Sequence, residues 1–122
     1  MSDAQEFVGN AHGDLEAIRV ALESDATLAN AASDWSGGDW ETGLGAAAHM
    51  GRRDIADLLL GYGARLDMFA AAMLGEVEIV RAILTAHQEL RDAKGPHGIP
   101  LRAHAEAGGE HARAVLELLD TL

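Results

Sequence analysis

Imidazole and carboxylate groups are the side chains of this 122-residue chain best suited to acid–base chemistry. His97 lies in the segment GPHGIP, whose two prolines and two glycines predict a stiff loop that fixes the direction of the ring. His49 and Asp39 are the other groups that we expect near such a base. We therefore name His97, His49 and Asp39 as candidate catalytic residues, while the reaction itself stays unknown.

Linear spacing argues against the usual metal and cofactor motifs. No two of the six histidines have the i, i+4 spacing of H-E-x-x-H, and no acidic segment has the calcium-loop pattern. Gly-x-Ser-x-Gly and phosphate-loop signatures are also absent from the sequence. We expect no metal and no cofactor, and we expect His12, His87 and His111 to be ordinary surface residues.

Both tryptophans of the chain lie in one glycine-rich segment, SDWSGGDWETGLG, at positions 33–45. Trp35 and Trp40 either pack onto the helices or contact a ligand, and the sequence leaves both readings open. Asp34, beside Ser-Gly-Gly, is expected to accept backbone N–H bonds in a turn. Glu41 is expected to pair with Arg52 or Arg53 at the surface.

The rest of the chain predicts helices. GDLEAIRVALES, RDIADLLLGYG, EVEIVRAILTAH and HARAVLELLDTL each carry apolar residues at helical spacing on one face. Between these segments lie LGAAAHMG, FAAAMLG and LRAHAEAGG, which are so rich in alanine that they form helices only where neighbouring backbones approach closely. The predicted fold class is all-α.

The pattern also repeats, and the repeats resemble the ankyrin family. TGLGAAAHMGRRDIADLLLGYGARLD follows that family's motif best, and PLRAHAEAGG with the helix after it follows next. The matching positions are Thr42, Leu44, Ala47, Ala48, Gly51, Ile55, Leu58, Leu59, Leu60, Gly63 and Ala64, and then Pro100, Leu101, Ala105, Gly108, Val115 and Leu118. The resemblance predicts one domain, 1–122, with repeats at about 4–30, 41–66, 67–91 and 97–122.

The resemblance implies a solenoid of about four stacked helix–loop–helix units that binds a partner and carries no chemistry. It places His49 on the concave side, and it places His104 at a core alanine position, where the ring must find a hydrogen-bond partner. The family's usual histidine is replaced by Gly45 and Arg102. The hydrogen bonds that this histidine makes between repeats are therefore lost or made in another way.

Unequal repeat spacing predicts an opening in the stack. The glycines at 13, 51, 75 and 108 lie 38, 24 and 33 residues apart, so one loop is lengthened and one hairpin is missing. We expect a slot about 15–20 Å across between loops 33–41 and 93–99. The residues expected to bind a ligand there are Trp35, Asp39, Trp40, His49, Met68, Phe69, Met73 and His97.

Composition limits the partners. The net charge of −11 disfavours nucleic acid and anionic membranes and favours a basic or cationic partner. The chain has no cysteine and no apolar run long enough to cross a membrane, which is typical of a cytoplasmic protein. The apolar C-terminal repeat predicts a monomer or a weak homodimer through that end.

Two functions of different class follow from these observations. The first is an ankyrin-type binding module that recognises a protein segment or small ligand through the concave face and the slot. The alternative is a small cofactor-independent enzyme, an isomerase, cyclase or hydrolase, with a histidine and carboxylate acid–base pair in that slot. The sequence favours the binding module over the enzyme because the resemblance is to a binding scaffold.

Overall fold

The computed structural model describes residues 3–122, which are mostly helical, as the sequence predicts. The α-helices follow one another in pairs: α1 (Asp3–Asn10) and α2 (Leu15–Ser24), α3 (Gly43–His49) and α4 (Arg53–Gly61), α5 (Met68–Leu74) and α6 (Val77–Ala86), α7 (Leu101–Ala107) and α8 (Arg113–Asp120). Short 3₁₀ turns are η1 (Ala26–Asn30), η2 (Gln88–Asp92), η3 (Pro96–Gly98) and η4 (Gly109–Ala112). Within residues 3–122, every helix is too short or too polar to cross a membrane.

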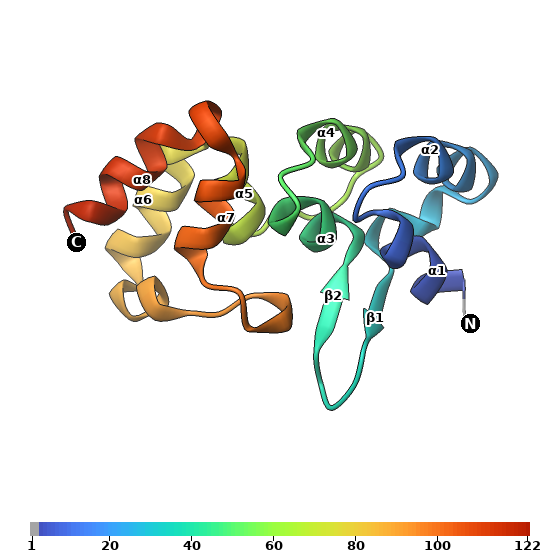
Figure 1. Cartoon of the computed structure of the whole chain (residues 1–122), viewed down its shortest axis with the longest axis horizontal. Helices are drawn as coiled ribbons and strands as arrows, with labels where there is room; N and C mark the ends of the chain where they lie inside the picture. Colours follow the sequence, from blue (N-terminus) through green and yellow to red (C-terminus); the bar gives the residue numbers. More distant parts are fainter. Residues whose placement is uncertain (1–2) are drawn as a thin grey trace.

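The pairs stack along the long axis of the molecule, with α1 and α2 at one end and α8 at the other (Figure 1). The helices α1, α3, α5 and α7 contact one another in series, and the other helices contact as α2 with α4 and α6 with α8. The alanine-rich segments form α3, α5 and α7 of this series because a methyl side chain lets helix backbones approach closely. Ala46, Ala47 and Ala48 of α3 are accordingly fully buried.

The core divides into two clusters of buried side chains. One is built from α1 to α4 with part of α5, and the other from α5 to α8. Met68 and Met73 belong to these clusters, with 8% and 1% of their surface exposed. They therefore do not form the floor of an open slot, because α5 is covered by its neighbours α3 and α7.

Two glycines allow the helix pairs to approach at their turns. Gly75 ends α5 with a left-handed φ of 80°, and a Cβ atom there would collide with the backbone carbonyl of His111. A Cβ atom at Gly108 would collide in the same way with the carbonyl of Met73. Glycine is required at both positions by the packing of the turn after α7 against the turn after α5.

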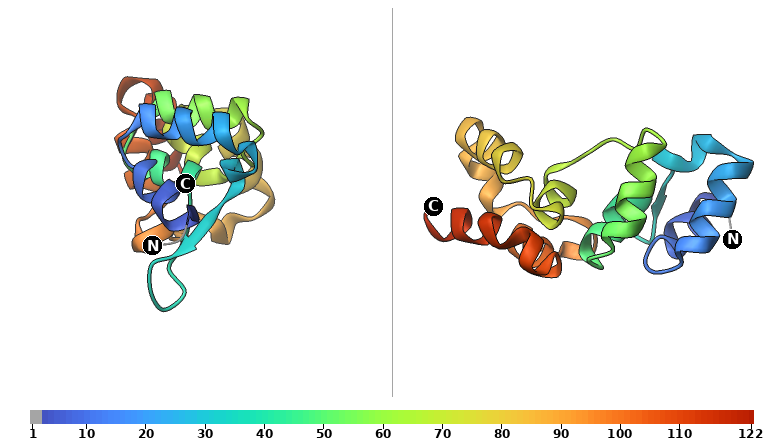
Figure 2. Two further views of the ribbon diagram at one scale, coloured as in Figure 1. Left: turned by 90° about the vertical axis from the view of Figure 1, so that its right-hand side faces the viewer. Right: turned by 90° about the horizontal axis from the view of Figure 1, so that it is seen from above.

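The loops between pairs differ in length. Strands β1 (Ala32–Asp34) and β2 (Trp40–Thr42) form an antiparallel hairpin that extends away from the helices (Figure 2). The link between α4 and α5 has no hairpin, and the loop before α7 is closed by a bridge between Lys94 and Pro100. Asp34 accepts hydrogen bonds from the backbone N–H groups of Ser36 and Gly38, which confirms its predicted role in the hairpin turn.

Candidate metal centre

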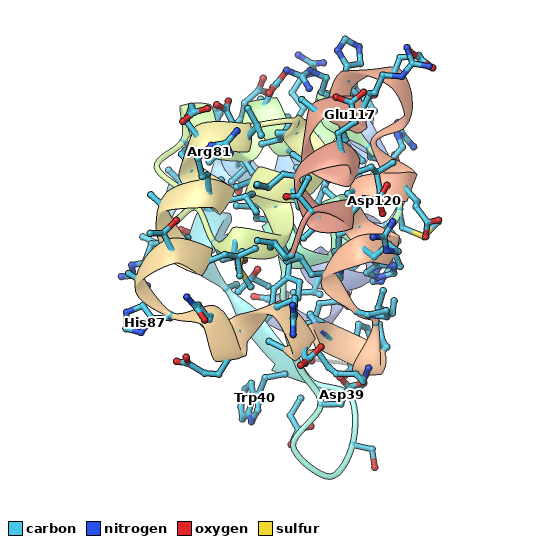
Figure 3. The ribbon with its side chains drawn as sticks, turned by 90° about the vertical axis from the view of Figure 1, so that its left-hand side faces the viewer. Asp39, Trp40, Arg81, His87, Glu117 and Asp120 are labelled. Carbon is cyan, nitrogen blue, oxygen red and sulfur yellow. The ribbon has the colours of Figure 1, made fainter. Side chains whose placement is uncertain are left out.

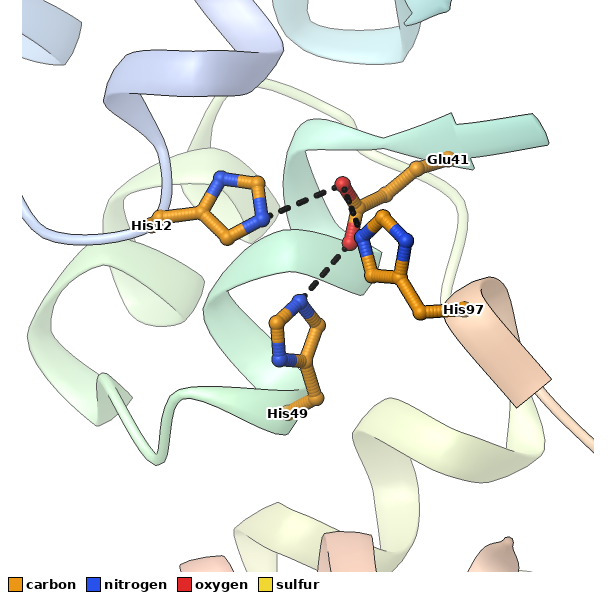
Figure 4. A group of neighbouring side chains, drawn as sticks. All are labelled: His12, Glu41, His49 and His97. Atoms are coloured by element: carbon orange, nitrogen blue, oxygen red, sulfur yellow. Dashed lines mark hydrogen bonds and ion pairs between the residues drawn. The ribbon is translucent and has the colours of Figure 1, made fainter. Parts of the chain in front are cut away.

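The carboxylate of Glu41 lies at the centre of three imidazole rings (Figure 4). His49 Nε2 is 2.9 Å from Oε2, and the Nε2 atoms of His12 and His97 are each 3.2 Å from Oε1. Trp35 Nε1 donates a hydrogen bond of 2.8 Å to the same Oε1 atom. We call His12, Glu41, His49 and His97 the three-histidine cluster.

Three separate parts of the chain place these side chains. His12 follows α1, His49 is the last residue of α3, and His97 lies in η3. Glu41 is the middle residue of β2, where side chains alternate between the two faces of the strand. Trp40 is therefore 62% exposed while Glu41 is only 1% exposed.

A second layer of contacts orients two of the rings. His12 Nδ1 is 3.0 Å from the carbonyl oxygen of Val8 and 3.1 Å from that of Gly9. His97 Nδ1 is 2.7 Å from Asp39 Oδ2. Carbonyl and carboxylate oxygens only accept hydrogen bonds, so Nδ1 carries a hydrogen in both rings and Nε2 faces Glu41.

Neutral rings do not satisfy this arrangement. With its one hydrogen on Nδ1, a neutral imidazole has a lone pair on Nε2. In His12 and His97 that lone pair would face a carboxylate oxygen of Glu41, which is also an acceptor. Either a second proton on each ring or a cation between the nitrogens and the carboxylate removes the conflict.

The electrostatic environment favours the charged forms of Asp39, Glu41 and His97. Burial by itself raises the pKa of Glu41, but hydrogen bonds from His49 and Trp35 outweigh it and lower that pKa overall. The hydrogen bond from the backbone of His97 lowers the pKa of Asp39. Burial opposes the charged form of His97, yet its hydrogen bond to Asp39 and the nearby charge of Glu41 raise the pKa of His97.

The spacing of the four side chains suits one small metal ion. Their ligand atoms all lie within 4.8 Å of one another. Four ligands in a tetrahedron at the usual zinc distance of about 2.0–2.1 Å are about 3.4 Å apart. The nitrogen-to-oxygen distances of 2.9–3.2 Å are already close to that separation. The remaining pairs of ligand atoms are within 4.8 Å, so side chains would have to move for all four to bind one ion.

Several residues lie elsewhere than the sequence predicts. His12 belongs to the cluster and is not an ordinary surface residue, since its side chain is only 27% exposed and contacts Glu41. Glu41 is buried and pairs with histidines, whereas Arg52 pairs with Asp54 and Arg53 donates to the carbonyl of Leu74. Both errors have one cause, because the three histidines surround Glu41 only after separate parts of the chain come together in the fold.

The slot that we expected between loops 33–41 and 93–99 is closed at the contact between Asp39 and His97. The two loops that were to form its walls are joined by hydrogen bonds of 2.7 Å. Two hollows of the surface lie elsewhere, one of about 620 Å³ along α1 and α2 and one of about 300 Å³ beside α6 and the C-terminus. Neither hollow is lined by a residue of the three-histidine cluster.

The remaining candidates divide between this site and other places. Trp35, Asp39, His49 and His97 meet at the cluster, while the ring of Trp40 stands clear of the helices (Figure 3). Phe69 packs against His104 with ring centroids 4.8 Å apart. His104 is buried as predicted, and its Nδ1 donates to the carbonyl of Pro100 at 2.9 Å.

Linear spacing could not reveal this cluster, because its members come from the turn after α1, from β2 with α3, and from η3. The expectation of no metal was based only on linear spacing in the sequence, and the geometry of the cluster shows that this spacing is not sufficient evidence. Comparison with known proteins adds no relative, since no family model, no curated protein and no solved structure matches the chain.

Proposed function

We propose that the protein is a binding module whose ligand is a single divalent transition-metal ion, held by the three-histidine cluster. The convergence of three Nε2 atoms and one buried carboxylate within 4.8 Å carries this proposal. Metal ions are bound by ionised carboxylate and by imidazole nitrogen in its neutral form, so binding releases the proton of any ring that is charged. The Nδ1 atoms of His12 and His97, which point away from Glu41, already have hydrogen-bond partners.

The ligand set favours zinc, iron, cobalt or nickel over calcium or magnesium. Imidazole suits the transition metals, whereas the hard cations prefer ligand sets made of oxygen. The side chains of His12 and His97 are 27% and 33% exposed, so an ion between them would lie near the solvent. Zinc is the probe that we choose, because four ligands of this kind match its tetrahedral geometry.

Isothermal titration calorimetry with zinc chloride tests the proposal. We expect one zinc ion per wild-type chain and a loss of at least about tenfold in affinity for His49→Ala, which lacks one ligand. His111→Ala is the matched control, since His111 is exposed and lies outside the cluster. Absence of zinc binding by the wild type, or equal binding by His49→Ala, would contradict the proposal.

An ankyrin-type stack is the scaffold that we propose for this module. Four helix pairs, the contacts in series from α1 to α7 and the glycine turns at Gly75 and Gly108 support it. The exposed indole of Trp40 supports a second use of the scaffold, the recognition of a protein segment beside the hairpin. This proposal also includes a location in the cytoplasm, a basic partner, and a monomer or weak dimer as the oligomeric state.

A second candidate function is acid–base catalysis by His97. The observation that favours it is the 2.7 Å contact between His97 Nδ1 and Asp39, which orients a partly exposed ring. The test is hydrolysis of p-nitrophenyl acetate in the presence of a metal chelator. Catalysis that is lost in His97→Gln and kept in His111→Gln would support it, whereas equal rates for the two variants would contradict it.

A further inference from the structure

We infer that Asp39 is a positioning residue of the metal site, because it sets both the backbone conformation and the ring tautomer of His97. The inference rests on the proposed metal binding and assigns a role to a residue outside the ligand set. Asp39 lies at the end of the hairpin, and its partner is 58 residues away in the chain. The contact brings a ligand from the C-terminal half of the stack to the cluster.

Both oxygen atoms of the Asp39 carboxylate hold His97. Oδ1 accepts the backbone N–H of His97 at 2.7 Å, and Oδ2 faces the ring Nδ1 atom at 2.7 Å. A residue held at its backbone and at its ring has little freedom to turn. Asp39 therefore fixes the direction in which Nε2 points, which is toward Oε1 of Glu41 at 3.2 Å.

The backbone of His97 needs such a contact. Its φ of 62° is the only positive φ of a non-glycine residue between residues 3 and 122. Residues other than glycine rarely adopt this left-handed conformation, so hydrogen bonds from the surrounding structure must hold the residue there. The Asp39 Oδ1 atom supplies one such bond from the other side of the site.

The ring tautomer depends on Asp39 as well. Asp39 and Glu41 each favour a hydrogen on the ring nitrogen that they face, and the Asp39 contact of 2.7 Å is shorter than the Glu41 contact of 3.2 Å, so we expect Asp39 to keep the hydrogen of His97 on Nδ1. The lone pair of the neutral ring is then on Nε2, which is the atom that faces Glu41 and would bind the ion. Metal-binding histidines commonly have their other ring nitrogen bound to a carboxylate in this way.

Asp39→Asn separates this role from simple packing. The backbone N–H of His97 can only donate, so it takes the amide oxygen, and the amide NH₂ group must then face Nδ1. To accept that bond, Nδ1 needs its lone pair, and the hydrogen of the neutral ring moves to Nε2. The substitution keeps the shape of the side chain at position 39, but it places a hydrogen on Nε2 of His97, which is the atom that would bind the ion.

The first test is nitrogen NMR of the His97 ring in zinc-free protein, recorded above the pH at which the ring titrates. We expect the hydrogen on Nδ1 in the wild type and on Nε2 in Asp39→Asn. The same tautomer in both proteins would overturn the inference. This measurement needs no metal, so it decides the role of Asp39 even where the wild type fails to bind zinc and the proposed function is wrong.

The second test is a competition titration with zinc and a chelator of known affinity. We expect Asp39→Asn to bind zinc about 10–100-fold more weakly than the wild type. Asp120→Asn is the matched control, because Asp120 is an exposed carboxylate that pairs with Arg102 far from the cluster in the chain. Equal zinc affinity of wild type and Asp39→Asn would overturn the inference, as would an equal loss in Asp120→Asn.

Discussion

Glu41 is the residue on which the three-histidine cluster depends. A buried carboxylate is unfavourable unless it is paired and hydrogen-bonded, and Glu41 is 1% exposed with four side-chain nitrogen atoms at 2.8–3.2 Å from its oxygens. It lies on a strand of three residues, between the exposed Trp40 and the helix cap Thr42. The alternation of the strand thus buries a charge that the surrounding histidines can balance.

The first prediction concerns this buried charge. In zinc-free protein, Glu41→Gln should lower the free energy of unfolding by about 2 kcal/mol, because several donors lose their charged acceptor. Urea unfolding measures this quantity. Asp120→Asn, the same change at an exposed ion pair, should alter it by less than about 1 kcal/mol. A Glu41→Gln variant as stable as the wild type would show that the cluster does not need the charge.

The second prediction concerns His104, which is buried with no hydrogen-bond partner for Nε2. Burial lowers the pKa of His104 below its ordinary value of 6.5 in the folded chain. The unfolded chain therefore binds the proton more readily, and the part of stability due to this ring is full above pH 6.5 and is lost as the pH falls below it.

His104→Leu tests this sign. In the variant, the carbonyl of Pro100 still accepts a hydrogen bond from the backbone N–H of Ala103, at 3.1 Å. Urea unfolding at pH values on each side of 6.5 should show that the wild type loses more stability on acidification than the variant does. Parallel losses in the two proteins would contradict a neutral buried ring.

At the scale of elements, close contact between short helices determines the stack. The alanines of α3 and α5 are buried because these helices have neighbours on both sides in the series. The turns that join the pairs must also fit, and Gly75 lies directly against the carbonyl of His111. The distance between pairs thus depends on positions that have no side chain.

Gly75→Ala and Gly63→Ala form a matched pair for the third prediction. Both glycines have a left-handed φ, 80° and 90°, but a Cβ atom at Gly63 would meet open space. In both variants the free energy of unfolding should fall by about 1 kcal/mol, because alanine disfavours the left-handed backbone conformation. In Gly75→Ala it should fall by about 1–3 kcal/mol more, because the added Cβ atom collides with the carbonyl of His111. Thermal or urea unfolding compares them, and equal losses would mean that the pairs do not approach so closely.

The elements could be predicted from the sequence more fully than the site. Helical spacing of apolar residues predicts the helix pairs, and the extra residues around Ser36 predict the longer loop. The inward direction of Glu41 could not be predicted, because a strand of three residues is too short to show alternation in its sequence. His12 was missed because its partners Glu41 and His49 are adjacent to it only after the pairs stack.

At the scale of the molecule, the three-histidine cluster lies across the division between the two cores. His12, Glu41 and His49 come from the half formed by α1 to α4, and His97 comes from the half that contains α7 and α8. An ion at this site would therefore be bonded to both halves. The bonds of His97 to Asp39 and Glu41 already cross the same division.

The fourth prediction follows from this placement. Zinc at 100 times its dissociation constant should raise the free energy of unfolding of the wild type by about 2.7 kcal/mol, and a chelator should reverse the change. At that same zinc concentration, the free energy of unfolding of His97→Ala should rise markedly less, because the C-terminal half then supplies no ligand to the ion. A gain in His97→Ala equal to that of the wild type would show that the ion does not join the halves.

Diffraction from a crystal of the wild-type protein grown with zinc, recorded at the zinc absorption edge, tests the metal site most directly. We predict one strong anomalous peak per chain at about 2.0–2.1 Å from the Nε2 atoms of His12, His49 and His97 and from a carboxylate oxygen of Glu41. A zinc ion bound only at other residues, or no peak at this position, would contradict the proposed metal centre.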